Sequence, residues 1–286
     1  LGEGHRWVYE RFVEPAPPFT TITQTETVYN VTYTNTRCFV PATVFDNTHL
    51  MEQDPGYVGR LAQLPEMERR AFLYGRWDIF FGQVFSEFSE ETHVCPSFFI
   101  PPDWPRWCAI DYGYDAPMAA LWLTKDLAYF KETKLPRYYC YREAYRRGLD
   151  PIRQGIYIRN LSQDERIRQY IADPSIWMSR GKGLSTAVDY MNAGLRPLTK
   201  GNPDRIMGKG RVHWLLGKNA DGTPRLQVFP QCHNLIRSLP MLQADKHNPE
   251  DVDSDGDDHA YDCLRYWAMQ QASPIQRHAP VEYKIA

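Results

Sequence analysis

The sequence has few cysteines, and they are not arranged in pairs. The six cysteines are scattered, and no two of them form a C-x-x-C motif. Several lie in apolar, strand-like runs, where cysteine behaves as a small hydrophobic residue. We therefore expect neither a zinc site nor a disulfide framework, and a reducing compartment fits best. No apolar run approaches the roughly 18 residues of a membrane-spanning helix and no signal peptide opens the chain, which predicts a soluble intracellular protein without a membrane partner.

Charge of one sign is not in excess either. The 286 residues include 33 Lys and Arg against 35 Asp and Glu, a formal net charge of -2. Overall charge thus neither requires nor excludes a nucleic-acid partner, and any basic surface must be local. Hydrophobic residues make up 43% of the chain and aromatic residues 14%, enough for a core and too much for a disordered chain.

Prolines mark the clearest linker, CPSFFIPPDWPRW at 95–107, and we place a domain boundary near residue 98. Before it, the sequence predicts a short helix at 5–13, Thr-rich strand residues at 20–40, and helices at 54–64 and 65–74. After it, three successive strands precede alternating helices and strands, which predicts an α/β fold with a mixed sheet flanked by helices. The expected strands are 107–111, 117–124, 137–145, 168–173 and 195–198, with a hairpin-like segment at 224–229; the expected helices are 150–163, 184–193, 203–216, 231–239 and 257–270.

Two acids close apolar strands. Asp111 ends one predicted strand and Asp173 another. In an open α/β sheet, ligands gather outside the carboxyl ends of the strands, so both acids could face one crevice. Either acid could instead begin a turn or cap a helix.

A third group of acids crowds into DVDSDGDDHAYD at 251–262. Like charges at this density repel one another, so something positive should lie among them. Acids at the start of the last helix could simply interact with its dipole. Asp262 lies further in, among Tyr261, Cys263 and Leu264, where a free carboxylate is unfavourable unless it is paired.

The same segment has the spacing of a calcium-binding EF-hand loop. Positions 1, 3, 5, 6 and 12 of such a loop would be Asp251, Asp253, Asp255, Gly256 and Asp262. Position 12 is Asp rather than the usual Glu, and position 8 is Asp258 where an apolar side chain is expected. The preceding QADKHNPEDV does not read as an entering helix. A calcium-binding interaction module built on 251–262 stays an alternative.

Three motifs, in this order and spacing, resemble the nuclease domain of tailed-phage terminase large subunits. They are CAIDYGYDAPMAALWL from residue 108, YIADPS from residue 170 and DGDDHAYDCLRYWAM from residue 255, and PRLQVFPQCHNLIRSLPML before the last of them is also similar. The resemblance implies a ribonuclease H-like nuclease domain over 98–286 and a metal-dependent endonuclease. It assigns the catalytic acids to Asp111, Asp173 and Asp262, and the metal ligands to these acids with Asp258 and His259.

Two divalent ions about 3.5–4 Å apart can activate a water and stabilise the leaving oxygen when a phosphodiester is cut. Hard oxygen ligands suit Mg²⁺ or Mn²⁺. The hypothesis is that Asp111 bridges two ions, that Asp173 holds one of them, and that Asp262 with His259 holds the other.

The first part of the chain resembles the end of the terminase ATPase domain. The similar segments are GHRWVYERF, RCFVPATVFDNTHL and LPEMERRAFLYGRWDIFFGQVF, which makes 1–97 a smaller α+β segment with the linker to the nuclease. The phosphate loop G-x-x-x-x-G-K-[ST] is absent, since RGKGLS at 180–185 has the wrong spacing. We therefore expect no ATP hydrolysis from this chain, and we expect the motor to precede Leu1.

The resemblance also implies double-stranded DNA as the partner, with the portal and the small terminase subunit as further partners of the full-length protein in the cytoplasm of the infected bacterial host. A resolvase-like nuclease acting on branched DNA is the enzymatic alternative. DNA requires local positive surface, although basic side chains also occur on ordinary solvated faces. The candidates are Arg142, Arg146, Arg147, Lys182, Lys200, Arg205, Lys209 and Arg211.

Overall fold

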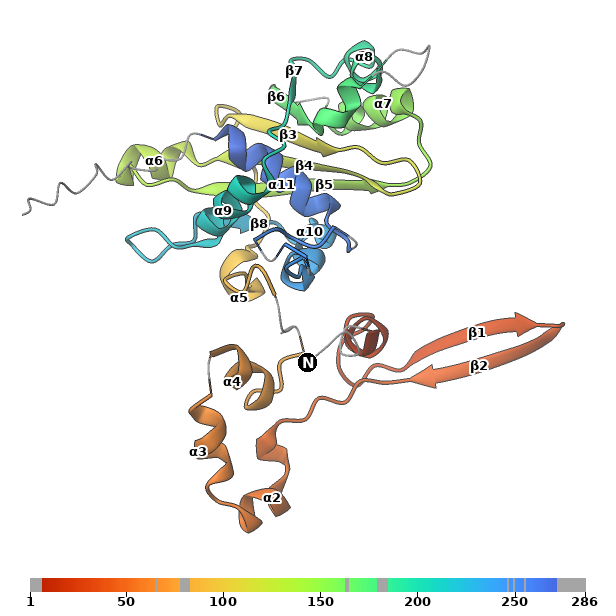
Figure 1. Ribbon diagram of the computed structural model, residues 1–286, viewed down its shortest axis with the longest axis vertical. Helices are drawn as coiled ribbons and strands as arrows, with labels where there is room; N and C mark the ends of the chain where they lie inside the picture. The colour runs from red at the N-terminus through yellow and green to blue at the C-terminus, as the bar shows by residue number, and fades with distance from the viewer. Residues whose placement is uncertain are drawn as a thin grey trace, which may run out of the picture. The chain divides into compact units, whose positions relative to one another are not determined.

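The computed structural model describes residues 7–64, 66–77, 83–162, 165–178, 185–245, 247–248, 250–254 and 256–271. The chain divides into two compact units. The first consists of Leu1–Ser86 with Pro240–His247, and the second of Glu87–Leu239 with Asn248–Ala286. The proline-rich linker at 95–107 thus belongs to the second unit. The elements of both units are drawn in Figure 1.

The first unit holds a β-hairpin and short helices. Strands β1 (Ile22–Val28) and β2 (Val31–Arg37) pair antiparallel through a two-residue turn. Both turn residues, Tyr29 and Asn30, have positive φ, at 48° and 62°, which gives the twist that such a turn requires. A π-helical segment precedes the hairpin (Tyr9–Val13), and a 3₁₀ turn (Val44–Asp46) and helices α2 (Thr48–Gln53), α3 (Tyr57–Ala62) and α4 (Glu66–Phe72) follow it.

The second unit is built on a six-stranded sheet with the order β7-β6-β3-β4-β5-β8. Strands β3, β4 and β5 form an antiparallel meander, whereas β6 pairs parallel with β3, β7 with β6, and β8 with β5. The mixed sheet expected from the sequence is confirmed. The strands are β3 (Arg106–Asp111), β4 (Met118–Lys125), β5 (Tyr138–Arg146), β6 (Ile167–Ala172), β7 (Leu198–Lys200) and β8 (Leu226–Val228).

Helices cover this sheet because its central strands are apolar on both faces. In β3, Cys108 and Ile110 join a core cluster that includes Ile158 of α7. The intervening Trp107 points to the other face, where its ring centroid lies 6.1 Å from that of Trp267 in α11. Side chains alternate along a strand, so Asp111 shares the α11 face with Trp107. The helices are α5 (Glu90–His93), α6 (Leu127–Thr133), α7 (Pro151–Leu161), α8 (Thr186–Asn192), α9 (Arg205–Leu216), α10 (His233–Ser238) and α11 (His259–Gln270), with 3₁₀ turns at Pro174–Trp177 and Leu239–Met241.

Aspartates start several of these helices. The side chains of Asp126, Asp150 and Asp204 accept backbone N–H groups at the first turns of α6, α7 and α9. Helix α11 differs, because Asp258 occupies its N-cap position without a capping hydrogen bond from its side chain. The Asp258 carboxylate instead lies 3.7 Å from Nη2 of Arg205 in α9. Within the described ranges, no helix is both long and apolar enough to cross a membrane.

Candidate active site

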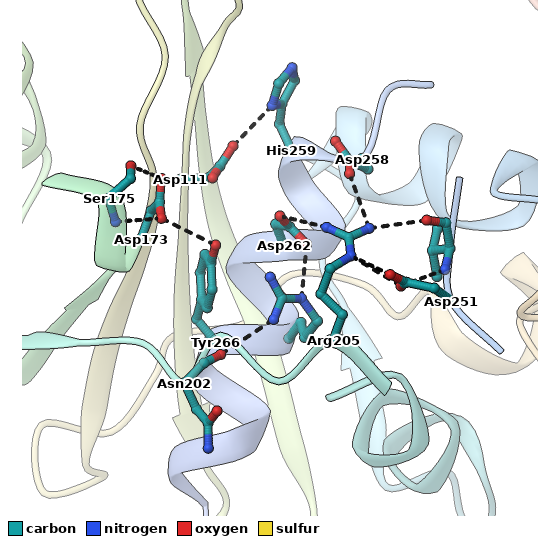
Figure 2. A network of polar contacts seen from close by, with 12 residues as sticks. Asp111, Asp173, Ser175, Asn202, Arg205, Asp251, Asp258, His259, Asp262 and Tyr266 are labelled. Atoms are coloured by element: carbon teal, nitrogen blue, oxygen red, sulfur yellow. Dashed lines mark hydrogen bonds and ion pairs between the residues drawn. The ribbon is translucent and has the colours of Figure 1, made fainter. Parts of the chain in front are cut away.

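Asp111 is the last residue of β3, and Asp173 directly follows β6, the parallel neighbour of β3. Ile110 of β3 is in register with Ala172 of β6, and the backbone N–H of Asp173 donates to the carbonyl oxygen of Ile110 at 2.9 Å. Asp111 and Asp173 come directly after Ile110 and Ala172, so they lie on the same face of the sheet and at the same end of the strands. Figure 2 shows the two carboxyl groups next to each other. The backbone ladder thus brings together two acids that lie far apart in the sequence.

Helix α11 adds the third acid. The helix packs on the sheet, where the Sγ of Cys263 lies 3.3 Å from the carbonyl oxygen of Ala119 in β4. At its first turn, Nδ1 of His259 donates to Oδ2 of Asp111 at 2.9 Å. Asp262 lies three residues after His259, close to one turn further along the same helix (Figure 2). Three distant segments of the chain therefore meet at one end of β3.

Burial and mutual repulsion perturb these carboxyl groups. Asp111 is only 8% exposed. Burial raises the pKa of Asp111 to about 6, the hydrogen bond from His259 opposes this rise, and the charges of Asp262 and Asp173 add to it. Burial, followed by the charge of Asp262, raises the pKa of Asp258 to about 7. The pKa of His259 is also raised, chiefly because it donates to Asp111. Such a cluster favours a bound cation, which would relieve the repulsion.

Two arginines supply positive charge among the acids. The Nε of the buried Arg265 lies 2.9 Å from Oδ1 of Asp262. Arg205, the first residue of α9, approaches Oδ2 of Asp262 and Oδ2 of Asp258, each at 3.7 Å. The Nε of Arg205 also lies 2.9 Å from Oδ2 of Asp251. Arg205 therefore links α9 to the acidic segment 251–262, as Figure 2 shows.

The donor set fits a hard divalent cation, because it consists of carboxylate oxygens with one imidazole. As the side chains stand, no three His, Cys, Asp or Glu groups in the described part of the chain lie close enough to share an ion. Asp262 is held by Arg265, and Asp173 by Ser175. A cation that binds here has to compete with these partners.

Asp173 is oriented by residues that the sequence analysis did not single out. The backbone N–H of Ser175 donates to Oδ1 of Asp173 at 2.9 Å, and its hydroxyl group donates to Oδ2. The hydroxyl group of Tyr266 donates to Oδ1 at 3.5 Å. Gly201 leaves room for this tyrosine, since a Cβ at residue 201 would lie 2.5 Å from the Cδ1 atom of Tyr266. The i, i+4 spacing of Asp262 and Tyr266 on one helix is a signal that could have indicated this role.

The basic residues predicted to bind DNA do not form one cluster in the described part of the chain; they lie at several separate positions. Arg146 ends β5, Arg147 follows it, and both line a cleft with His259. Arg205 lies among the acids. Arg142 lies elsewhere: its Nη2 is 2.6 Å from Oε1 of Glu165, and its guanidinium lies 5.5 Å from the ring centroid of Trp122, on the α7 face of the sheet.

Of the remaining candidates, Lys200 ends β7, and Lys209 and Arg211 lie on α9. The Nζ of Lys200 is 5.6 Å from the ring centroid of Trp177. Lys182 lies outside the described residues. Contact with DNA stays a prediction for every one of these basic side chains.

The calcium-loop alternative requires a helix before the loop. The described residues between 242 and 258 contain no helix, and Asp255 lies outside the described residues. Asp251 is bound by Arg205, and Asp262 lies within α11. The described part of this segment therefore lacks the helix–loop–helix form of a calcium site.

Comparison with solved structures finds the large terminases of phages. The nuclease domain of the phage P22 large terminase aligns with a TM-score of 0.51 and 20% identity, over 66% of this chain and 92% of that domain. The large terminase of a thermophilic bacteriophage, in complex with ADP, aligns with a TM-score of 0.52 and 16% identity, over 81% of this chain and 54% of that protein. The chain thus spans about half the length of that ADP-bound terminase. The large terminase nuclease of the thermophilic phage G20c with bound magnesium has a TM-score of 0.47 and 15% identity, over 67% of this chain and 98% of that one.

No family model and no curated protein sequence matches the chain. At the identities found for the solved structures, the likeness establishes the fold. The ribonuclease H-like sheet expected from the three sequence motifs is confirmed: the chain shares its fold with the nuclease domain of phage large terminases.

Proposed function

We propose that the chain is a metal-dependent DNA endonuclease of a viral packaging terminase, which cuts concatemeric phage DNA. The observation that carries the proposal is the approach of Asp111, Asp173 and Asp262 to one end of β3, in a fold shared with terminase nuclease domains. Double-stranded DNA is the proposed substrate. The portal and the small terminase subunit are the proposed partners of the full-length protein, in the cytoplasm of the infected host.

In this proposal, two Mg²⁺ or Mn²⁺ ions are held by the three acids together with Asp258 and His259. Ions of this kind supply an activated water and stabilise the leaving oxygen of the phosphodiester. Contacts within the site orient the carboxylates. His259 holds the carboxylate of Asp111 toward α11, and Arg265 fixes the carboxylate of Asp262. A ligand set that is oriented before the substrate arrives loses less free energy to reorganisation.

Residues 1–97 are proposed to be the end of the ATPase domain with the linker to the nuclease. Their resemblance to that domain and the absence of a phosphate loop support a chain that cuts DNA without hydrolysing ATP by itself.

Plasmid cleavage tests the proposed nuclease. Wild-type chain is incubated with supercoiled plasmid and Mg²⁺, Mn²⁺, Ca²⁺ or EDTA, beside the variants Asp262→Ala and Asp111→Asn. Asp103→Asn, in an exposed loop before β3, is the matched control. We expect Mg²⁺ or Mn²⁺ to support cutting, EDTA to stop it, and both site variants to lose about 100-fold or more in rate. Cutting that persists in Asp111→Asn, or that needs no divalent ion, would remove the assignment. Competition between duplex and four-way junction substrates separates this function from a resolvase-like one.

A further inference from the structure

A cleft of about 510 Å³ opens beside the acids, on the side of His259. Its polar lining comes from three elements. Tyr145 and Arg146 end β5 with Arg147 directly after them, and Arg237 belongs to α10. His259 is the first residue of α11, and Asp257 lies two residues before it. The volume is in the range of pockets that hold small ligands, and thus of one or two nucleotide units. Arg237 was not among the basic residues singled out from the sequence.

The lining of the cleft carries more positive than negative charge. It includes three arginines and one carboxylate, that of Asp257, and its other titratable side chains are those of Tyr145 and His259. Arg146 and Arg147 are exposed, and the Nε of Arg146 lies 3.3 Å from the hydroxyl oxygen of Tyr157. Guanidinium groups bind phosphate oxygens through paired, charge-assisted hydrogen bonds. A phosphodiester backbone is therefore the ligand that suits this lining.

The cleft leads directly to the proposed catalytic acids. His259 lines the cleft and also donates to Asp111 at 2.9 Å. The ring centroids of Tyr145 and His259 lie 6.2 Å apart in an edge-to-face arrangement. A strand whose cut phosphate lies at Asp111 would place an adjoining phosphate in the cleft.

The guanidinium of Arg237 is already paired with the carboxylate of Asp257. An Nη2 hydrogen bond joins Arg237 to Oδ2 of Asp257, and the hydroxyl group of Tyr145 donates to Oδ1. The side chains of Arg237 and Asp257 keep 35% and 23% of their exposure, so solvent and ligand can reach the pair. An anionic ligand that binds Arg237 has to replace this carboxylate.

We propose that the cleft binds a DNA backbone phosphate next to the one that is cut, through Arg237 together with Arg146 and Arg147, and that Asp257 occupies Arg237 until the phosphate displaces it. This inference rests on the proposed nuclease function and adds the path of one DNA strand. It makes opposite predictions for the two partners of one ion pair. Loss of Arg237 weakens DNA binding, whereas neutralising Asp257 strengthens it, because the competing carboxylate is gone.

DNA affinity tests the inference in the full chain. A short fluorescein-labelled duplex is titrated with protein in EDTA, so that no cutting occurs, and anisotropy is read over a series of salt concentrations. The variants are Arg237→Gln and Asp257→Asn. The matched controls are Arg168→Gln and Glu132→Gln, which remove one charge of each sign. Both control residues are exposed and lie toward the other end of the sheet, near the start of β6 and in α6.

We expect Arg237→Gln to weaken binding about fivefold or more and to lower the slope of log K against log salt by about 0.9, the value for one lost phosphate contact. We expect Asp257→Asn to tighten binding about threefold. Both controls should stay close to wild type. A folding defect cannot produce tighter binding, so Asp257→Asn keeps the test valid even if Arg237→Gln is destabilised.

Two results would overturn the inference. If wild-type chain cuts plasmid while both cleft variants bind duplex like their controls, the cleft does not hold DNA, although the nuclease proposal stands. If wild-type chain neither binds duplex nor cuts plasmid with any divalent ion, the nuclease proposal and the cleft fail together.

Discussion

Asp111→Asn should stabilise the metal-free protein at alkaline pH. Asp111 is buried beside Asp262 and Asp173, and its pKa rises from an ordinary 3.8 to about 6. Asparagine has nearly the same shape and no charge, and its side-chain oxygen can still accept the hydrogen bond from Nδ1 of His259. The substitution therefore removes the unfavourable charge while it keeps the packing of the site.

The sign and size follow from the change in pKa on folding. A carboxyl group with a raised pKa in the folded state destabilises that state wherever it is ionised. The penalty is absent below pH 3.8, grows between 3.8 and about 6, and is complete at higher pH. One pKa unit corresponds to about 1.4 kcal/mol, so the full penalty is about 3 kcal/mol. The raised pKa of His259 gives the same trend with pH, because its charged form is stabilised by Asp111 at low pH and this stabilisation is lost as pH rises through the folded pKa.

Urea unfolding in EDTA measures this effect. Fluorescence reports the second unit through the buried residues Trp107, Trp122 and Trp267. At about pH 8, Asp111→Asn should exceed wild type by up to about 3 kcal/mol, and the difference should disappear near pH 4. Saturating Mg²⁺ should stabilise wild type and not the variant. A variant that is less stable than wild type at about pH 8, or a difference that does not change with pH, would refute the electrostatic account of this site.

Three further outcomes are expected. Gly208→Ala should destabilise the protein by about 1–3 kcal/mol in thermal or urea unfolding, because a Cβ there would lie 2.4 Å from Cγ of Arg265. Gly210→Ala, on the same helix with nothing within 4 Å of the added Cβ, should instead stabilise by about 0.5–1 kcal/mol, and equal effects of the two would contradict this packing. Arg205→Gln should tighten Mg²⁺ or Mn²⁺ binding in calorimetry while lowering stability in EDTA, since its charge offsets Asp258 and Asp262; unchanged affinity would show that it does not compete with the ion. Purified chain should hydrolyse ATP no faster than a buffer blank in a phosphate-release assay, and hydrolysis above that background would contradict the inference from the missing phosphate loop.

Most of the sheet was predictable, because its signals are local. Apolar runs ending in turn residues indicated β3, β4, β5 and β6, and helical periodicity indicated α7, α9 and α11. Helix α6 was missed because the segment between Lys125 and Arg137 reads as a turn, although Asp126 caps a helix there. Strand β7 begins later than predicted, at Leu198. The preceding Pro197 has no N–H to donate to a ladder.

The candidate site was predictable only in part. An acid at the end of an apolar strand is a pattern within a few residues, and it pointed to Asp111 and Asp173. The arginines that form ion pairs with the acidic segment 251–262 could not be found in this way. Arg205 and Arg237 reach Asp251 and Asp257 only after α9 and α10 have packed beside α11, and no spacing in the sequence encodes that contact. The density of acids predicted that a cation would be present, not which residue supplies it.

The pairing of β3 with β6 also determines how this site can change. The spacing of Asp111 and Asp173 is a property of the main chain, since it follows from the parallel register of Ile110 with Ala172. Most substitutions within β6 leave that spacing intact, whereas deleting a single residue there would turn Asp173 to the opposite face of the sheet. Related chains can therefore diverge widely in strand sequence and keep the two acids side by side, provided that they keep the residue count.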